Sequence, residues 1–512
     1  MKRLAIAAVA VLAVYLLRLD RAAGLIVDDA WYALLAKALA QGDGFRLISS
    51  AVTPIMPAVP PGYPLMLAPL FLIRPAFPQN VFLLKAVSIA AMMGVGLVVY
   101  RYLVKYRETA APMAAAIAAA TVLTPAFVFL ATSTLMAECV FTLGLVLTVM
   151  WLDRTARAQP TSQARCAAAA GMLAAATMLV RTAGAATFLG GLLFLLQQRA
   201  YRSAAAFTLV ASLCLGPWMI YSTRHAPTLS QSAEHGGTIA YSYADLLSMV
   251  SPRIPRLGRI HAADLVPRIR TNLIGILGRD VGGVLVPSLF RGADESGEEV
   301  VALAGSTATI VSSMGGSPVT VTITLMLSAI VLVGFIRALR RGVTAAEMVV
   351  GVSLAVLLTV PTATFRYVLP LTPFLLFYFV TGLEAMTRAP LAARIAVMCV
   401  LGLQLQDHAG YIALKLRDPA RLDWLRDARG AAELTDWMNA NLEGEGAVAS
   451  TNPGLVYLLT GRKTVATDEF SRGWERWKAS GVRYIVALRP LALPSKSLTY
   501  RLLYQSPHRI FW

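Results

Sequence analysis

The sequence predicts a polytopic α-helical membrane protein with about eleven transmembrane helices and a small C-terminal α/β domain on the outer face. Of its 512 residues, 57% are hydrophobic and only 14% are charged, whereas soluble domains carry about 25% charged residues. Apolar runs of about 20 residues recur along the chain, and each is long enough to cross a bilayer as a helix. Near residue 412 the composition changes to that of a soluble domain.

The net charge of +18 is explained by arginines that flank membrane spans, so it does not indicate a nucleic-acid partner. The four cysteines form no CxxC pair, and the five histidines show no HExxH or similar spacing. We therefore predict neither a disulfide framework nor a structural metal site.

The expected spans cover residues 4–20, 81–101, 112–131, 136–152, 167–183, 185–198, 203–221, 319–336, 345–361, 367–384 and 394–411. With a cytoplasmic N-terminus, every short inside loop is basic, as the positive-inside rule requires. The charges concerned are Arg101, Lys105, Arg107, Arg154, Arg157, Arg165, Arg199, Arg202, Arg337, Arg340, Arg341, Arg388 and Arg394. An odd number of spans then puts the C-terminus on the periplasmic side of the inner membrane.

The first span is expected to remain uncleaved, with Arg18 reaching the membrane surface at its end. A cleaved signal peptide is the alternative, because Ala22-Ala23-Gly24 loosely matches a cleavage site. Residues 1–411 form the predicted transmembrane module, whose spans are in contact with membrane lipids.

Two long outer-face loops separate the spans. In the first (21–80), residues 30–40 predict a helix lying in the interface, ended by Gly42, and Pro60-Pro61 marks a rigid turn. The second loop (222–318) is long, and loops of this length are usually functional or disordered. In it, basic residues precede an acidic patch. These residues are Arg253, Arg256, Arg259, His261, Arg268 and Arg270, then Asp294, Glu295, Glu298 and Glu299.

The tail (412–512) predicts a soluble α/β domain. Residues 421–441 have helical periodicity, 447–450 and 484–487 read as short buried strands, and a helix is expected near 472–480.

Asp28 and Asp29 are adjacent carboxylates just beyond the first span. An acid near hydrocarbon is costly and is typical of a functional site, where it can act as a general base. The alternative is that both acids only favour the first turn of a helix.

Other charged residues are expected at the same membrane level. Glu138 begins the fourth span and could be a helix-terminal acid. Arg181, at the outer end of the fifth, needs an anionic partner such as Glu138 or a ligand. Arg366-Tyr367 suits a phosphate, which guanidinium binds through two bonds, although interfacial anchoring is the alternative. Arg224 is a weaker candidate of the same kind.

Several segments, in this order along the chain, resemble the GT-C glycosyltransferases. They are most similar to the branch with protein O-mannosyltransferases and lipid A aminoarabinose transferases. The segments are Asp28-Asp29 followed by AWYALLAKALAQGDGF, then PPGYP, MAECVF, MLVRTAG, GPWMIYSTRHA, FRYVLPLTPFLLF and WMNANLEGEGAVASTNPGLVYLLTGRKTV.

The resemblance implies an enzyme that moves a hexose or pentose from a polyprenyl-phosphate donor to an acceptor on the outer face. The acceptor would be lipid A, a protein or an envelope glycan. It implies Asp28 as general base with Asp29 as its companion, Glu138 as the second acid, and Arg366 as a donor-phosphate contact.

The sequence departs from the family at one place: relatives often have a lysine beside the di-proline turn, where this chain has Ala58-Val59. Phosphate binding then rests on Arg366 or Arg224, and Tyr63 is expected to line the site. The resemblance implies no cofactor. Joint binding of a divalent cation by Asp28, Asp29 and Glu138 stays an alternative.

Two other functions fit a chain of this kind. A flippase or transporter of lipid-linked sugars would explain the spans and outward charges, but it predicts inverted repeats and polar residues at the bilayer midplane. The chain shows few of either, and its charges gather at one face. The other alternative hypothesis is a binding or assembly protein that acts on the outer face through its C-terminal tail.

Overall fold

The computed structural model describes residues 2–51, 53–226, 247–250, 258–286, 318–361, 365–444, 446–466, 481–488, 502–505 and 509–511. Several predictions fall outside these ranges. They are the acidic patch at Asp294, Glu295, Glu298 and Glu299, the basic residues Arg253 and Arg256, and the helix near 472–480.

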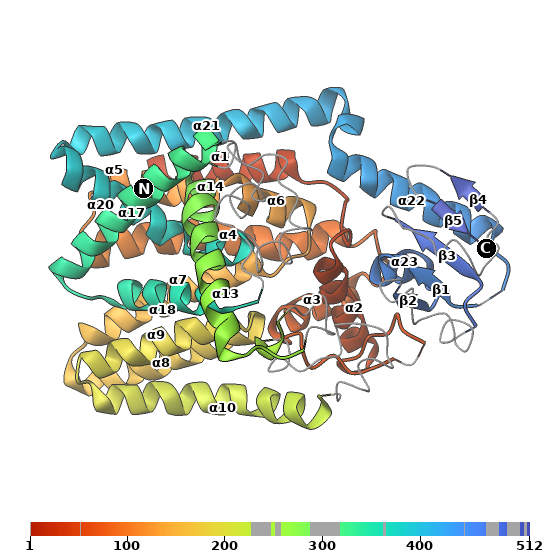
Figure 1. The fold of residues 1–512 in the computed structure, drawn as a ribbon, viewed down its shortest axis with the longest axis horizontal. Coiled ribbons are helices and arrows are strands. Elements are labelled where there is room, and N and C mark those ends of the chain that lie inside the picture. The colour runs from red at the N-terminus through yellow and green to blue at the C-terminus, as the bar shows by residue number, and fades with distance from the viewer. Residues whose placement is uncertain are drawn as a thin grey trace.

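Helices that run roughly along one axis make up most of the molecule, and a small sheet lies at one end of them (Figure 1). The helices are α1 (Lys2–Arg18), α2 (Val27–Gln41), α3 (Gly62–Ile73), α4 (Val81–Tyr106), α5 (Ala111–Val122), α6 (Pro125–Ser133), α7 (Glu138–Ala156), α8 (Pro160–Val180), α9 (Gly184–Gln197), α10 (Tyr201–His225), α13 (Ala262–Gly275), α14 (Val281–Leu285), α17 (Pro318–Arg341), α18 (Ala345–Thr359), α19 (Phe365–Val368), α20 (Thr372–Thr387), α21 (Pro390–Arg417), α22 (Asp423–Asn441) and α23 (Pro453–Thr460).

Within the described residues, six helices are long and apolar enough to cross a membrane, or seven if the bent pair α5 and α6 counts as one span. The pair bends by 48° immediately before Pro125, whose ring favours the first turn of a new helix. Each of the eleven predicted spans falls on helical residues, although the span predicted at 112–131 covers the bent pair α5 and α6. The chain is a multi-pass membrane protein, while eleven crossings stay a prediction.

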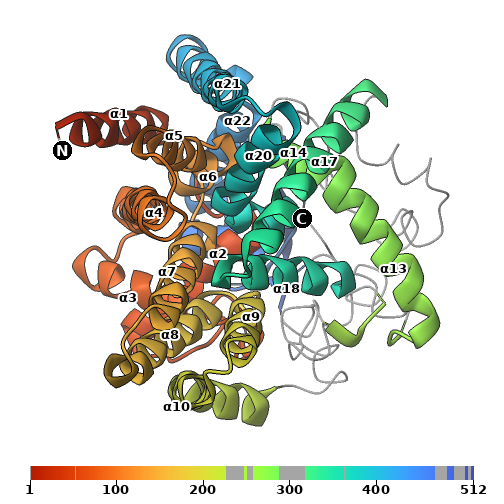
Figure 2. The same cartoon turned by 90° about the vertical axis from the view of Figure 1, so that its left-hand side faces the viewer.

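The interior helices of the bundle each contact several others. Helix α7 packs against α4, α8 and α9, and α20 packs against α5, α17 and α21. Viewed along the helix axes, α2 lies near the middle of the picture (Figure 2), and Figure 1 places it at the end of the bundle next to the sheet. Helix α2 packs there against α3 and α23.

Helix α2 confirms the helix predicted at 30–40 and begins earlier, at Val27. It ends at Gly42, which has φ +83° and donates its backbone N–H to the carbonyl of Leu39. A left-handed residue of this kind ends a helix at little cost only when it is glycine. The earlier start places Asp28 and Asp29 in the first turn.

The C-terminal residues form a five-stranded sheet in the order β2-β1-β3-β5-β4. Its strands are β1 (Val448–Ser450), β2 (Thr464–Ala466), β3 (Tyr484–Ala487), β4 (Leu502–Gln505) and β5 (Arg509–Phe511). Strand β1 pairs in parallel with β2 and β3, while β5 is antiparallel to β3 and β4. The strands predicted at 447–450 and 484–487 are confirmed as β1 and β3.

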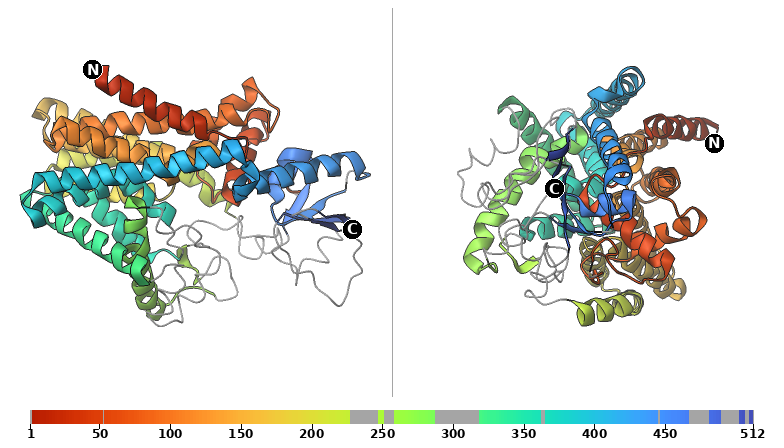
Figure 3. Two further views of the ribbon diagram at one scale, coloured as in Figure 1. Left: turned by 90° about the horizontal axis from the view of Figure 1, so that it is seen from above. Right: turned by 90° about the vertical axis from the view of Figure 1, so that its right-hand side faces the viewer.

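The sheet has its own hydrophobic cluster, formed with α22 and α23. Helix α21 runs along the bundle and leads into α22 beside the sheet (Figure 3), and α23 packs against α2. The sheet unit is thus held next to the segment that carries the two aspartates. That it forms a separate outer-face domain from residue 412 stays a prediction.

Candidate active site

Asp28 and Asp29 face different surroundings although they are adjacent. Successive residues of a helix point about 100° apart, so only one can face a given direction. The Asp28 side chain is 38% exposed, whereas Asp29 is fully buried.

Asp29 joins two connections of the chain. One carboxylate oxygen accepts the backbone N–H of Gly24 at 2.7 Å, between α1 and α2. The other accepts the backbone N–H of Leu135 at 2.9 Å, between α6 and α7. Burial raises the pKa of Asp29 to about 7, against the lowering effect of these two donors and of Lys85.

Lys85 is a buried cation next to this junction. Its Nζ donates to the backbone carbonyls of Asp20 at 2.8 Å, Ala22 at 2.6 Å and Thr132 at 2.8 Å, and to Asp20 Oδ1 at 3.0 Å. An ammonium with four acceptors is fully satisfied, so Lys85 fixes the end of α1 against α4 and α6. Lys85 was not among the predicted site residues, although a lysine inside a predicted span is itself a signal of a functional or structural role.

Arg366 on α19 connects the acids of two other helices. Its Nη2 donates to Asp28 Oδ2 at 3.3 Å, and its Nη1 lies 3.7 Å from Glu138 Oε1 at the start of α7. Arg181, just after α8, forms an ion pair with the same Glu138 oxygen. The cluster Asp28, Glu138, Arg181 and Arg366 therefore brings four segments of the chain together.

A pocket of about 130 Å³ opens beside this cluster. Arg181 lies over the ring of Tyr367, with its guanidinium carbon 5.3 Å from the ring centre. The wall includes Ala58 and Val59, so the pocket is apolar at the place where the similar GT-C enzymes often have a lysine. The lining residues are Asp28, Trp31, Tyr32, Ala58, Val59, Pro60, Arg181, Thr182 and Tyr367.

Two residues predicted for the site, Tyr63 and Arg224, lie outside this group. Tyr63 is fully buried behind Tyr32, with ring centres 5.1 Å apart, and its hydroxyl is 3.1 Å from Ser88 Oγ. Arg224 is exposed in the last turn of α10 and does not line the pocket. Conversely, the pocket includes Trp31, Tyr32 and Thr182, which sequence reasoning did not single out.

The three acids do not form a shared cation site. Asp28 pairs with Arg366, both Asp29 oxygens accept backbone N–H groups, and Glu138 pairs with Arg181. Among the described residues, no group of three or more His, Cys, Asp or Glu side chains could hold a metal ion. The positive charges that pair with Asp28 and Glu138 are guanidinium groups.

No family model and no curated protein matches this sequence. Among solved structures, the chain is similar to ArnT from Cupriavidus metallidurans bound to undecaprenyl phosphate. The two are 12% identical with a TM-score of 0.50, over 99% of this chain and 97% of that one. It is also similar to the archaeal oligosaccharyltransferase AglB from Archaeoglobus fulgidus, in complex with an inhibitory peptide and a dolichol-phosphate. There the identity is 12% and the TM-score 0.52, over 94% of this chain and 69% of that one.

At these identities the likeness is one of fold. It extends from the first helix to the C-terminal sheet, because the match with ArnT covers nearly the full length of both chains. The chain therefore shares its fold with ArnT and AglB, as the resemblance to the GT-C glycosyltransferases led us to expect.

Proposed function

We propose that this protein is a membrane glycosyltransferase that transfers a sugar from a polyprenyl-phosphate donor to an acceptor on the outer face of the inner membrane. The observation that carries the proposal is the position of Asp28. It is a partly exposed carboxylate in the wall of a pocket that also contains Arg181. Base and phosphate-binding cation thus share one pocket.

Asp28 is the proposed general base. Its carboxylate is partly exposed in the pocket wall, where it can take the proton of an acceptor hydroxyl or amine within hydrogen-bond reach. Carboxylate and leaving phosphate then lie on opposite sides of the sugar carbon, so the displacement inverts its configuration. Phosphate is a good leaving group and needs no strong acid, so positioning and one base suffice.

Arg181 and Arg366 are the proposed donor-phosphate contacts. A guanidinium binds phosphate oxygens through two bonds, and Tyr367 supports the Arg181 side chain from below. Bound undecaprenyl phosphate and dolichol-phosphate in two proteins of the same fold support a lipid phosphate as the ligand. The pocket is smaller than the roughly 300–1,000 Å³ of typical ligand sites, so it suits the reacting groups rather than the whole donor.

Asp29 and Glu138 have supporting parts in this proposal. Asp29 fixes the first turn of α2 through the N–H groups of Gly24 and Leu135, which sets the direction of Asp28. Glu138 fixes the positions of the Arg181 and Arg366 side chains relative to each other, because both approach its Oε1 atom. Neither acid needs to contact the acceptor.

The experiment is a comparison of Asp28→Asn with Asp43→Asn, an exposed acid of the same loop. Envelope lipids, glycans and glycoproteins from cells with each variant are analysed by mass spectrometry. Binding of undecaprenyl phosphate to each purified protein is measured in parallel. We expect Asp28→Asn to lower the sugar-bearing product about 10²–10⁴-fold while the lipid still binds, and Asp43→Asn to behave as wild type. Unimpaired transfer by Asp28→Asn would overturn the base assignment.

A further inference from the structure

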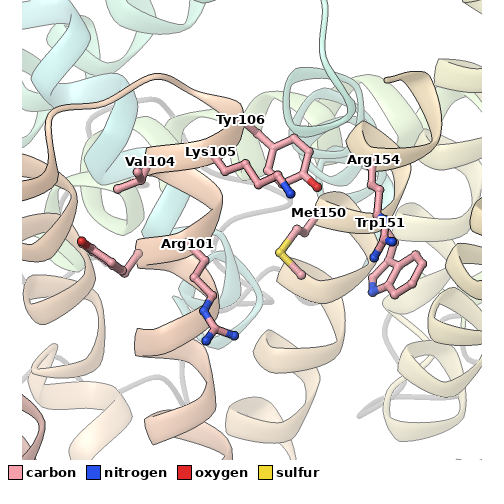
Figure 4. Close-up of a pocket in the computed structure, with 8 residues that line it drawn as sticks. Arg101, Val104, Lys105, Tyr106, Met150, Trp151 and Arg154 are labelled. Carbon is pink, nitrogen blue, oxygen red and sulfur yellow. The ribbon is translucent and has the colours of Figure 1, made fainter. Parts of the chain in front are cut away.

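A second and larger pocket lies between the C-terminal ends of α4 and α7, with a volume of about 440 Å³. Figure 4 shows Arg101 and Lys105 on α4, Arg154 on α7, and Met150 between Arg101 and Arg154 in this view. The lining residues are Tyr100, Arg101, Val104, Lys105, Tyr106, Met150, Trp151 and Arg154. The proposed transferase site uses none of them.

The three cations of this pocket have no acidic partner among the described residues. Arg101, Lys105 and Arg154 are exposed, and none takes part in an ion pair within those ranges. In the candidate active site, by contrast, Arg181 and Arg366 both have carboxylate partners. The pocket therefore presents three uncompensated positive charges.

Two acids on neighbouring helices, Asp153 and Glu347, are engaged inside the bundle, and the exposed Glu108 forms no ion pair with a described residue. Asp153 accepts the Tyr102 hydroxyl at 2.8 Å and the backbone N–H of Ala345 at 2.9 Å. Glu347 pairs with Arg107 at 2.7 Å. Both carboxylates are buried, so they cannot turn outward to neutralise the pocket without losing these bonds.

Aromatic and apolar side chains make up the remaining wall. The guanidinium carbon of Arg154 lies 4.5 Å from the Trp151 ring centre, and Lys105 Nζ lies 5.7 Å from that of Tyr106. Tryptophan and tyrosine are enriched where membrane meets water, and Met150 and Val104 add surface that suits hydrocarbon. The pocket therefore combines cationic and apolar groups, which match the two parts of a phospholipid.

The pocket lies at the opposite membrane surface from the candidate active site. Glu138 and Arg154 stand sixteen residues apart on α7, which corresponds to about 24 Å along a helix. The hydrocarbon core of a bilayer is about 30 Å thick. With Glu138 near the outer surface, Arg154 lies near the inner one, where the basic loops were predicted.

We propose that this pocket binds the phosphate of an anionic membrane phospholipid, with the acyl chains lying along α4 and α7. Basic pockets between helices on the cytoplasmic side are suited to anionic head groups. Free phosphate shares the charge but lacks the chains that Met150 and Val104 would contact. The inference does not depend on the proposed transferase activity.

The test measures retained lipid by native mass spectrometry after reconstitution in nanodiscs with phosphatidylglycerol or, separately, phosphatidylcholine. The pocket variant is Arg101→Gln/Lys105→Gln/Arg154→Gln. Its matched control is Arg165→Gln/Arg340→Gln/Arg341→Gln, which removes three exposed charges from the same predicted side. We expect the pocket variant to retain phosphatidylglycerol at least about tenfold less than wild type, the control to retain it, and phosphatidylcholine to be retained by none.

A second variant, Met150→Trp, fills the pocket but keeps its charges, and we expect it to lose the lipid as well. Equal loss in the pocket and control variants would overturn the proposal, because general attraction to basic loops would then explain the binding. Retention by Met150→Trp would also overturn it. So would displacement of the lipid by inorganic phosphate alone, since the pocket would then be a site for soluble phosphate.

Discussion

Asp28 and Asp29 carry the same functional group in different surroundings. Asp28 faces the pocket and one guanidinium, while Asp29 is enclosed and accepts two backbone N–H groups. The first is available to an acceptor and the second is not. Neighbouring residues on a helix point about 100° apart. One carboxylate can therefore be the proposed base while the other positions the helix.

Asp29 should make stability depend on pH. Its folded carboxyl keeps a proton up to about pH 7, whereas the unfolded one loses it near pH 3.8. Between these values the folded state binds more protons, so the free energy of unfolding should fall as pH rises from about 4 to 7. Asp29→Asn cannot titrate and should remove this slope. It also replaces one acceptor oxygen by a donor, which lowers the unfolding free energy by about 1–3 kcal/mol.

The measurement is the thermal midpoint of the detergent-solubilised protein across that pH range. Asp43→Asn, an exposed acid that follows α2, serves as the control and should keep the wild-type slope. An unchanged slope in Asp29→Asn would show that Asp29 is ionised throughout.

Both Arg366 and Arg224 were expected to bind the donor phosphate, and lipid binding by variants of each shows which one does. Arg366→Gln removes a charge beside the pocket and should weaken binding of undecaprenyl phosphate about 10- to 100-fold, as expected for a lost charged hydrogen bond. Arg224→Gln, at the exposed end of α10, should change it less than about twofold. Titration of the purified variants with the lipid measures both. The reverse order would place the phosphate near α10 instead.

At the scale of elements, the C-terminal unit holds the segment that carries the proposed base. Asn452, just before α23, donates its side-chain N–H groups to the carbonyls of Gly24 at 2.8 Å and Leu25 at 3.2 Å. Gly24 in turn donates to Asp29. At Gly454 an added Cβ would come within 2.9 Å of Ala30. Helices α23 and α2 therefore approach closely because position 454 has no side chain.

Asn452→Ala should lower turnover more than binding. Its loss leaves two carbonyls without their donor and loosens the connection before α2, so Asp28 is less well oriented. We expect a fall of about 10- to 100-fold in product formation with binding of undecaprenyl phosphate nearly unchanged. Asn441→Ala, which removes an exposed amide on α22, is the matched control. Equal effects of the two variants on product would argue against coupling between the units.

At the scale of the whole molecule, the distribution of arginines predicts which surface faces the cytoplasm. A fluorescent protein fused after Ala158 should be bright, because the surrounding loop is basic and is predicted to stay inside. The same fusion after Asn441 should be dark, and alkaline phosphatase fused there should be active. Bright fluorescence at Asn441 would reverse the placement of the C-terminal unit and of the candidate active site.

Local features of this fold were readable from the sequence. Helix α2 and its end at Gly42 follow from composition and one glycine, and β1 and β3 follow from short runs of buried residues. Thr124-Pro125 also marks the bend between α5 and α6, which the sequence analysis treated as one span. All of these signals lie within a few residues of the feature that they predict.

Long-range contacts were not readable in the same way. Asn452 and Gly24 are separated by 428 positions, and Lys85 finds acceptors on two other segments, the connection after α1 and helix α6. Tyr63 illustrates the same difficulty. Its place beside the di-proline turn suggested the pocket wall, but its side chain points to Ser88 instead. Pairings of this kind depend on how helices assemble, which a local pattern does not encode.

The enclosed ammonium of Lys85 also sets an order of events during synthesis. A lysine within an inserting helix is costly until it finds partners. Asp20 and Ala22 leave the ribosome before Lys85, but Thr132 leaves it 47 residues later. The set of acceptors is therefore complete only once α6 has been made. Until then α4 can keep the Lys85 ammonium in the head-group region. The hydrogen bonds of Lys85 to Asp20, Ala22 and Thr132 therefore form late in biogenesis.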